Sequence, residues 1–214
     1  MKLLFIGNSA TYVHQIPQTL QHLLQLRGID AQITQCTKGG YELHRHADLT
    51  TEHGRLVQSE IQKQHDVVFL QDNGNCITSP EKQDAARLAC RNLITEIRQS
   101  GATPMLYVRP PYGKLLGELS PLEQCAKLDE LFGDISAELD TKCVFVNRAF
   151  AKAIQVTQIP MWGPDNAHTS PEGAYLAACT FYKALLGESP RGIDPCGINP
   201  AVAARLQEIA DTAT

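Results

Sequence analysis

The stretch Leu3-Leu4-Phe5-Ile6-Gly7-Asn8-Ser9, close to the start of the chain, sets the pattern for the fold. Four apolar residues in a row, followed by a glycine and two polar residues, are typical of a strand buried on both faces and of the loop after it. Comparable apolar runs recur along the chain, and they predict further strands at Ala31–Cys36, Val67–Leu70, Met105–Val108 and Val144–Val146.

Longer segments with the spacing of amphipathic helices lie between these runs. The clearest are Gln18–Leu26, Gln83–Ile97, Leu122–Leu139 and Ala174–Leu185. Strands that alternate with helices indicate βαβ units and a parallel sheet that is covered on both faces. We therefore expect a single α/β domain over residues 1–214, a three-layer α/β/α arrangement of flavodoxin-like size around a five-stranded parallel sheet.

Local signals at the expected helix ends support this assignment. Ser79 and Ser120 each precede a proline, the order expected of a capping residue and the first helical position. Glu123 completes a capping box with Ser120. Gly28 and Gly101 lie just past two expected helix ends, where a left-handed residue is favoured.

The composition excludes several classes of protein. Of the 214 residues, 43% are hydrophobic and 20% are charged, as in ordinary globular chains and unlike disordered ones. The 19 basic and 23 acidic residues give a net charge of −4, which argues against nucleic acid as a partner. No apolar run approaches the roughly 18 residues of a membrane span, and Leu3–Ile6 is too short for a signal peptide. We expect neither nucleic acid nor a membrane as a partner.

The cysteines indicate a reducing environment. There are seven, at positions 36, 76, 90, 125, 143, 179 and 196, and no two of them form a CxxC pair. This spacing argues against zinc fingers and thioredoxin-type redox pairs. Scattered cysteines in such a chain are typical of reduced thiols packed in a core, and they favour a cytoplasmic protein.

Polar residues follow the expected strands and form four candidate functional loops. Three of these loops are Gly7–Thr11, Thr37–Tyr41 and Gln71–Asn75, and the fourth, Asp165–Gly173, leads into a late helix. In open parallel sheets, ligands bind beyond the carboxyl ends of the strands. The loops that follow strands are therefore expected to share one functional edge.

The residues in these loops resemble the four sequence blocks of the SGNH hydrolases, the superfamily of GDSL-type esterases and lipases. Gly7-Asn8-Ser9 stands where that family has Gly-Asp-Ser, Gly40 matches the second block and Asn73 the third. Asp165 and His168 match the final Asp-x-x-His block, and the run Ser170–Ala178 after them resembles it closely. The resemblance spans Leu3 to about Leu186.

The resemblance implies a catalytic assignment. Ser9 would be the nucleophile, His168 the general base and Asp165 the residue that orients the imidazole. The backbone N–H groups of Ser9 and Gly40 and the side-chain amide of Asn73 would form the oxyanion hole. The resemblance implies no metal and no organic cofactor.

Two positions depart from the family pattern. Asn8 replaces the usual Asp, a residue that is not the triad acid, and it keeps a similar shape and an acceptor oxygen. The third block reads Gln71-Asp72-Asn73-Gly74 and lacks the usual Gly-x-Asn-Asp. Gln71 and Asn75 are therefore alternatives to Asn73 as the amide donor of the oxyanion hole.

Other residues near these loops carry weaker signals. The cluster His44, His46 and His53 has a spacing that matches no metal-ligand motif, and we expect these histidines at a solvated helix start. Tyr41 and Trp162 flank the expected site. Each is expected either to line a substrate pocket or to have only a packing role in the protein.

Arg109 directly follows the fourth expected strand. Its side chain is expected to contact a polar substrate or to pair with a surface carboxylate.

The resemblance and the size of the chain together favour a serine esterase acting on a small acyl ester, with acetyl favoured and an acetylated carbohydrate as one candidate substrate. Almost all of the 214 residues are needed for the sheet, its helices and the four loops, which leaves little for a lid. One alternative is a catalytically degenerate protein of the same fold that binds a small polar ligand. A weaker one is a flavodoxin-like mononucleotide binder.

Overall fold

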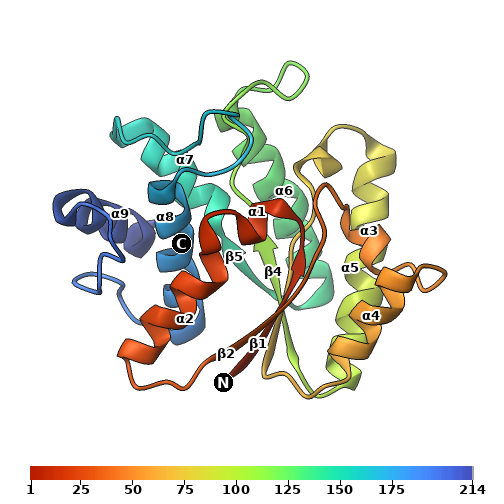
Figure 1. Cartoon of the computed structure of the whole chain (residues 1–214). Coiled ribbons are helices and arrows are strands. Elements are labelled where there is room, and N and C mark those ends of the chain that lie inside the picture. The colour runs from red at the N-terminus through yellow and green to blue at the C-terminus, as the bar shows by residue number, and fades with distance from the viewer. Residues whose placement is uncertain (214) are drawn as a thin grey trace.

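The computed structural model describes residues 1–213 and contains a five-stranded sheet with the strand order β2-β1-β3-β4-β5 (Figure 1). All neighbouring strands pair in parallel. The strands are β1 (Lys2–Gly7), β2 (Gln32–Thr37), β3 (Val67–Leu70), β4 (Thr103–Val108) and β5 (Lys142–Phe145). The predicted α/β class and the five-stranded parallel sheet are confirmed.

Helices cover both faces of this sheet (Figure 1). The helices are α1 (Ser9–Tyr12), α2 (Ile16–Leu26), α3 (Leu43–His46), α4 (Glu52–Ile61), α5 (Pro80–Gln99), α6 (Pro121–Leu139), α7 (Val146–Val156), α8 (Pro171–Leu186) and α9 (Pro200–Thr212), with the short 3-10 turns η1 (Val13–Gln15) and η2 (Gly74–Ile77). Buried residues of α2, α7, α8 and α9 form one core with the sheet, and those of α4, α5 and α6 form the other. Because the side chains of a strand alternate between faces, β1 sends Leu3 and Phe5 into the first core and Leu4 and Ile6 into the second.

The sequence signals for helix ends are confirmed in detail. Ser79 and Ser120 cap α5 and α6, and Ser120 forms a reciprocal capping box with Glu123. Gly28 and Gly101 have φ angles of +75° and +85°, the left-handed conformation expected just past the ends of α2 and α5.

The last strand differs from the prediction. It was expected at Val144–Val146, whereas β5 ends at Phe145 and Val146 is the first residue of α7. Phe145 provides no side-chain cap for that helix, so no polar signal marks the boundary. A run of apolar residues therefore concealed the change from strand to helix.

The seven cysteines are free thiols, five of them buried, in line with the expectation of reduced cysteines in the core. Within residues 1–213, the helices fall short of the length and apolar character that crossing a bilayer requires.

Candidate functional site at the carboxyl edge of the sheet

Ser9 begins α1 immediately after β1. Asn8 precedes it as the helix cap, and its Oδ1 accepts a hydrogen bond from the backbone N–H of Ala10 at 3.1 Å. The Asn8 Nδ2 donates to the carbonyl of Tyr41 at 2.8 Å, in the loop after β2. The capping residue therefore ties the Ser9 turn to the neighbouring loop.

Gln71, one of the alternatives for the oxyanion amide, is buried, and both ends of its side-chain amide form hydrogen bonds inside the protein. Its Oε1 accepts hydrogen bonds from the Asn8 N–H and the Thr11 hydroxyl, each at 2.9 Å, and its Nε2 donates to the Asp72 carbonyl. Gly7 is needed beside it, because a Cβ at Gly7 would lie 2.6 Å from Gln71 Oε1. These contacts make Gln71 a support of the Ser9 turn.

Gly40 lies in the loop after β2 with a φ angle of +71°. A Cβ placed there would have no atom within 4 Å, so the backbone conformation, and not crowding, favours glycine at this position. The carbonyl of Gly40 accepts a hydrogen bond of 3.4 Å from Asn73 Nδ2, which brings the second and third sequence blocks together.

Asp72 joins the loop after β3 to the start of α3, which follows the Gly40 loop. Its Oδ1 accepts hydrogen bonds from the backbone N–H groups of Leu43 and Asn73, both at 2.7 Å. The carboxyl is buried, and this burial raises the pKa of Asp72 to about 6. The positions of Asn73 and of Leu43, three residues after Gly40, therefore depend in part on a buried acid.

Asp165 and His168 form a hydrogen-bonded pair in the loop before α8. The imidazole Nδ1 lies 2.6 Å from Asp165 Oδ2, and the backbone N–H groups of Ala167 and His168 donate to Oδ1 at 2.9 and 3.0 Å. The hydrogen bonds from the His168 backbone, the imidazole and the Ala167 backbone hold the pKa of Asp165 well below its usual range. Asp165 is therefore an ionised acceptor. It contacts the imidazole of His168 at Nδ1, so Nε2 takes no part in this pair.

The segment Pro111-Tyr112-Gly113 connects the third block to the fourth. On one side, the Tyr112 hydroxyl donates to Asn73 Oδ1 at 3.0 Å. On the other side, Trp162 Nε1 donates to the Pro111 carbonyl and the Gly113 N–H donates to the Asn166 carbonyl, both at 2.9 Å. The loops that carry Asn73 and His168 are thus joined through the loop after β4.

The structure places the sequence-predicted residues in two contacting groups. Asp165 contacts His168, Asn73 contacts Gly40, and the Asn8 cap of the Ser9 turn contacts the residue after Gly40. Within residues 1–213, no hydrogen bond joins Ser9 to His168, so these two are related only by their place at the same edge of the sheet.

The structure contradicts one of the two alternatives for Arg109 and the expectation for His46. Arg109 does not pair with a surface carboxylate: it is 4% exposed, its Nε donates to the Pro110 carbonyl, and its guanidinium lies 4.1 Å from the Tyr112 ring centre. His46 is not solvated either, because it is fully buried on α3 and its Nδ1 lies 2.9 Å from Nε2 of His53. Burial lowers the pKa of His46 to about 3, so its ring is neutral.

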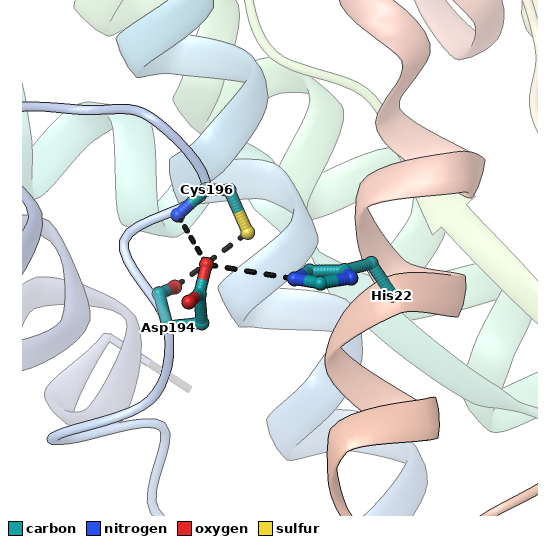
Figure 2. Close-up of side chains that lie close together, drawn as sticks. All are labelled: His22, Asp194 and Cys196. Atoms are coloured by element: carbon teal, nitrogen blue, oxygen red, sulfur yellow. Dashed lines mark hydrogen bonds and ion pairs between the residues drawn. The ribbon is translucent and has the colours of Figure 1, made fainter.

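A separate cluster offers three possible metal ligands, His22 on α2 and Asp194 and Cys196 in the segment between α8 and α9 (Figure 2). Their ligand atoms lie within 4.8 Å of one another. Asp194 Oδ1 already accepts the Cys196 N–H at 2.7 Å, and His22 Nε2 lies 3.5 Å from it. Burial raises the pKa of Cys196 to about 12, so the group is a thiol that donates to the Asp194 carbonyl. These contacts fasten the segment to α2.

Sequence reasoning missed three residues that organise the site: Asp72, Tyr112 and Gln124. Their contacts join positions 29, 39 and 12 residues apart in the chain. No local motif marks such partners, because each is selected by where two loops meet in the fold.

Neither a protein-family model nor a curated protein matches the chain. Solved structures do. A DUF4886 family protein from Bacteroides uniformis has a TM-score of 0.84 at 18% identity, covering 100% of this chain and 94% of that one. A candidate SGNH hydrolase from Slackia heliotrinireducens has a TM-score of 0.74 at 23% identity, covering 86% and 98%.

The acetylxylan esterase Axe2 from Geobacillus stearothermophilus has a TM-score of 0.70 at 18% identity, covering 87% of this chain and 94% of that one. At such identities the likeness concerns the fold. The parallel sheet, its strand order and these neighbours agree with the resemblance seen in the four loops, and the chain has the fold of the SGNH hydrolases.

Proposed function

We propose that this protein is a serine esterase that hydrolyses a small acyl ester through an acyl-enzyme. Ser9 is the nucleophile, His168 the general base and Asp165 the acid that orients it. Ser9 Oγ attacks the ester carbonyl while its proton passes to His168 Nε2, and the same proton then leaves with the alcohol. Water, activated by His168, releases the acid and restores Ser9.

The observation that carries this proposal is the Asp165–His168 pair. The 2.6 Å contact between Asp165 Oδ2 and His168 Nδ1 selects the tautomer in which Nε2 accepts a proton. Two backbone N–H groups hold the carboxylate in place, so it remains ionised while the imidazole takes up charge. A protein that only bound a ligand would have no use for an imidazole oriented in this way.

The oxyanion of the tetrahedral intermediate is stabilised by the backbone N–H groups of Ser9 and Gly40 and by Asn73 Nδ2. Asn73 Nδ2 contacts the Gly40 carbonyl, next to another proposed donor, which supports Asn73 over Gln71. The Gln71 side chain is held with its Oε1 on Asn8 and Thr11 and its Nε2 on the Asp72 carbonyl. A single such donor contributes about 3 kcal/mol to transition-state stabilisation.

A short acyl group is favoured as the substrate, with acetyl first. Within residues 1–213, the sheet, its helices and their connecting loops make up nearly all of the described chain, which favours an open site over one covered by a lid. The name of one structural neighbour, an acetylxylan esterase, adds acetylated carbohydrates as a class to test.

The experiment is covalent labelling with a fluorophosphonate, read by intact mass and peptide mapping. We expect one adduct on Ser9 in the wild-type protein and none in Ser9→Ala. Ser59→Ala, which removes an exposed serine on α4, is the matched control and keeps the adduct. Wild-type protein that is not labelled and does not turn over 4-nitrophenyl acetate contradicts the proposal and favours a ligand-binding protein of the same fold.

Turnover gives the second measurement. Ser9→Ala and His168→Ala each lower kcat for a short nitrophenyl ester by about 10³- to 10⁶-fold, because the members of a triad act as a unit. A panel of acetylated sugars and longer acyl esters then ranks the substrates by kcat/KM.

A further inference from the structure

The orientation of the Asn73 side chain is set by the groups around its oxygen. The backbone N–H of Asn75 donates to Asn73 Oδ1 at 3.0 Å. Because a backbone N–H can only donate, the atom that faces it must be the oxygen of the amide. The Nδ2 group therefore points the other way, toward the Gly40 carbonyl at 3.4 Å.

A second donor reaches the same oxygen from the loop after β4. The hydroxyl of Tyr112 lies 3.0 Å from Asn73 Oδ1. An amide oxygen has two lone pairs, and Asn75 and Tyr112 together occupy both. Two donors on the oxygen fix the plane of the amide and polarise it, which makes its N–H groups better donors.

Tyr112 is itself held from several sides. Its backbone N–H donates to Gln124 Oε1 at 2.9 Å, and Gln124 is a buried residue of α6. The guanidinium of Arg109 lies 4.1 Å from the centre of the ring. Gly74 makes room for both, because a Cβ at Gly74 would lie 2.7 Å from Arg109 Nη1 and 2.7 Å from Tyr112 Cε2.

We propose that Tyr112 is a positioning residue of the oxyanion hole, which holds the Asn73 amide so that Nδ2 faces the developing oxyanion. This inference rests on the proposed esterase function. It also accounts for the Asn73-Gly74 pair, which departs from the family wording: the glycine lets Tyr112 approach the preceding amide. Since an oxyanion exists only along the reaction path, the contribution of Tyr112 belongs in kcat and not in KM.

The test is a double-mutant cycle of Tyr112→Phe with Asn73→Ala, measured on 4-nitrophenyl acetate. Tyr112→Phe keeps the ring that contacts Arg109 and removes only the hydroxyl. We expect it to lower kcat about tenfold with KM changed less than about twofold, and Asn73→Ala to lower kcat about 10²- to 10³-fold. In the Asn73→Ala background, adding Tyr112→Phe changes kcat less than about twofold, since no amide is left to orient.

Two further variants complete the design. Tyr182→Phe removes a buried tyrosine hydroxyl whose partner is Glu188, remote from Asn73, and keeps kcat. Gly74→Ala displaces the Tyr112 ring and leaves its hydroxyl in place on the side chain. We expect this variant to lower kcat, as Tyr112→Phe does. Circular dichroism and thermal melts report folding of every variant.

Distinct results overturn the two proposals. An unchanged kcat in Tyr112→Phe, or an equal loss with and without the Asn73 amide, overturns the positioning role while Ser9 labelling and turnover persist. Wild-type protein without Ser9-dependent turnover overturns the esterase proposal, and the role of Tyr112 with it.

Discussion

Asn8 uses both ends of its side-chain amide, which explains why an amide suits the position where the SGNH sequence pattern has a carboxylate. Its Oδ1 caps α1, and its Nδ2 donates to the Tyr41 carbonyl. Asn8 is 2% exposed, so neither contact is easily replaced by water. An aspartate could accept the hydrogen bond that caps α1, but its carboxylate could not donate to the Tyr41 carbonyl.

We therefore predict that Asn8→Asp is destabilised at pH 7.5 by about 1–3 kcal/mol, because a carboxylate oxygen would face the Tyr41 carbonyl. The loss should shrink in acid, where a protonated carboxyl can donate. Urea unfolding at pH 7.5 and 4.5 measures it. Asn199→Asp is the matched control, since Asn199 caps α9 through Oδ1 alone and is exposed, and it should stay within about 0.5 kcal/mol. Equal stability of Asn8→Asp and wild type at pH 7.5 would contradict this account.

Asp72 gives a pH dependence with a definite sign. Its folded-state pKa of about 6 lies above the ordinary value near 4, so the folded protein binds more protons than the unfolded chain between these values. The Asp72 contribution to stability is thus fully present below about pH 4 and is lost as pH rises through 6. Both backbone contacts are on Oδ1, which an asparagine would keep.

We predict that Asp72→Asn gains stability relative to wild type by an amount on the order of 2–3 kcal/mol between pH 4 and pH 7, since one pKa unit corresponds to about 1.4 kcal/mol. Denaturant unfolding of both proteins across this range gives the difference. Asp84→Asn, at an exposed position of α5, should show no such trend. A constant difference between Asp72→Asn and wild type would rule out a titrating Asp72.

At the scale of elements, α6 organises the loop that joins the two halves of the site. Gln124 is 1% exposed; its Oε1 accepts from Tyr112, and its Nε2 donates to the carbonyls of Lys114 and Leu119 at 2.8 and 3.0 Å. One side chain therefore satisfies three backbone groups of the segment between β4 and α6. The helix itself begins with the Ser120–Glu123 capping box.

We predict that Gln124→Leu loses at least about 1–3 kcal/mol of stability, the cost of leaving a buried polar group without a partner. It should also lower kcat, because Tyr112 loses its backbone anchor. Urea unfolding and ester kinetics give the two readouts. Lys127→Ala, on the exposed face of the same helix, should change stability by less than about 0.5 kcal/mol. Wild-type stability in Gln124→Leu would show that the loop does not depend on this residue.

At the scale of the whole molecule, the sheet is held between two apolar cores. In the first, Phe181 of α8 lies edge-on against Phe5, Phe69 and Tyr107, at centroid distances of 5.5, 5.0 and 4.7 Å. The same helix begins directly after the loop of Asp165 and His168. Packing of α8 on the sheet therefore sets the position of that loop.

We predict that Phe181→Ala costs about 3–5 kcal/mol, the usual loss for a large aromatic side chain removed from a core. That is a substantial part of the roughly 5–15 kcal/mol that holds an average domain folded. Denaturant unfolding measures it against Leu88→Ala, a change at a 55% exposed position of α5, which should cost far less. Similar losses for the two variants would mean that α8 is not packed as described.

Much of the fold could be predicted because its signals are local. The apolar run Val67–Leu70 was placed with its observed bounds, since a strand buried on both faces has few polar residues to blur its ends. The start of α7 was not predicted, because β5 passes into this helix without a polar capping residue. The resemblance to the Asp-x-x-His block likewise implied a contact between Asp165 and His168, which the structure shows at 2.6 Å.

The sequence by itself determined the approximate positions of the five strands, the caps of several helices and the four polar loops, because apolar periodicity and caps act over a few residues. Only the tertiary structure decided how those loops meet. It buried Arg109 and His46, which looked like surface groups, bonded both ends of the Gln71 amide inside the protein, and brought the Tyr112 hydroxyl to Asn73 Oδ1. These outcomes depend on contacts between segments that the parallel sheet brings to one edge, and no local pattern records which side chains meet there.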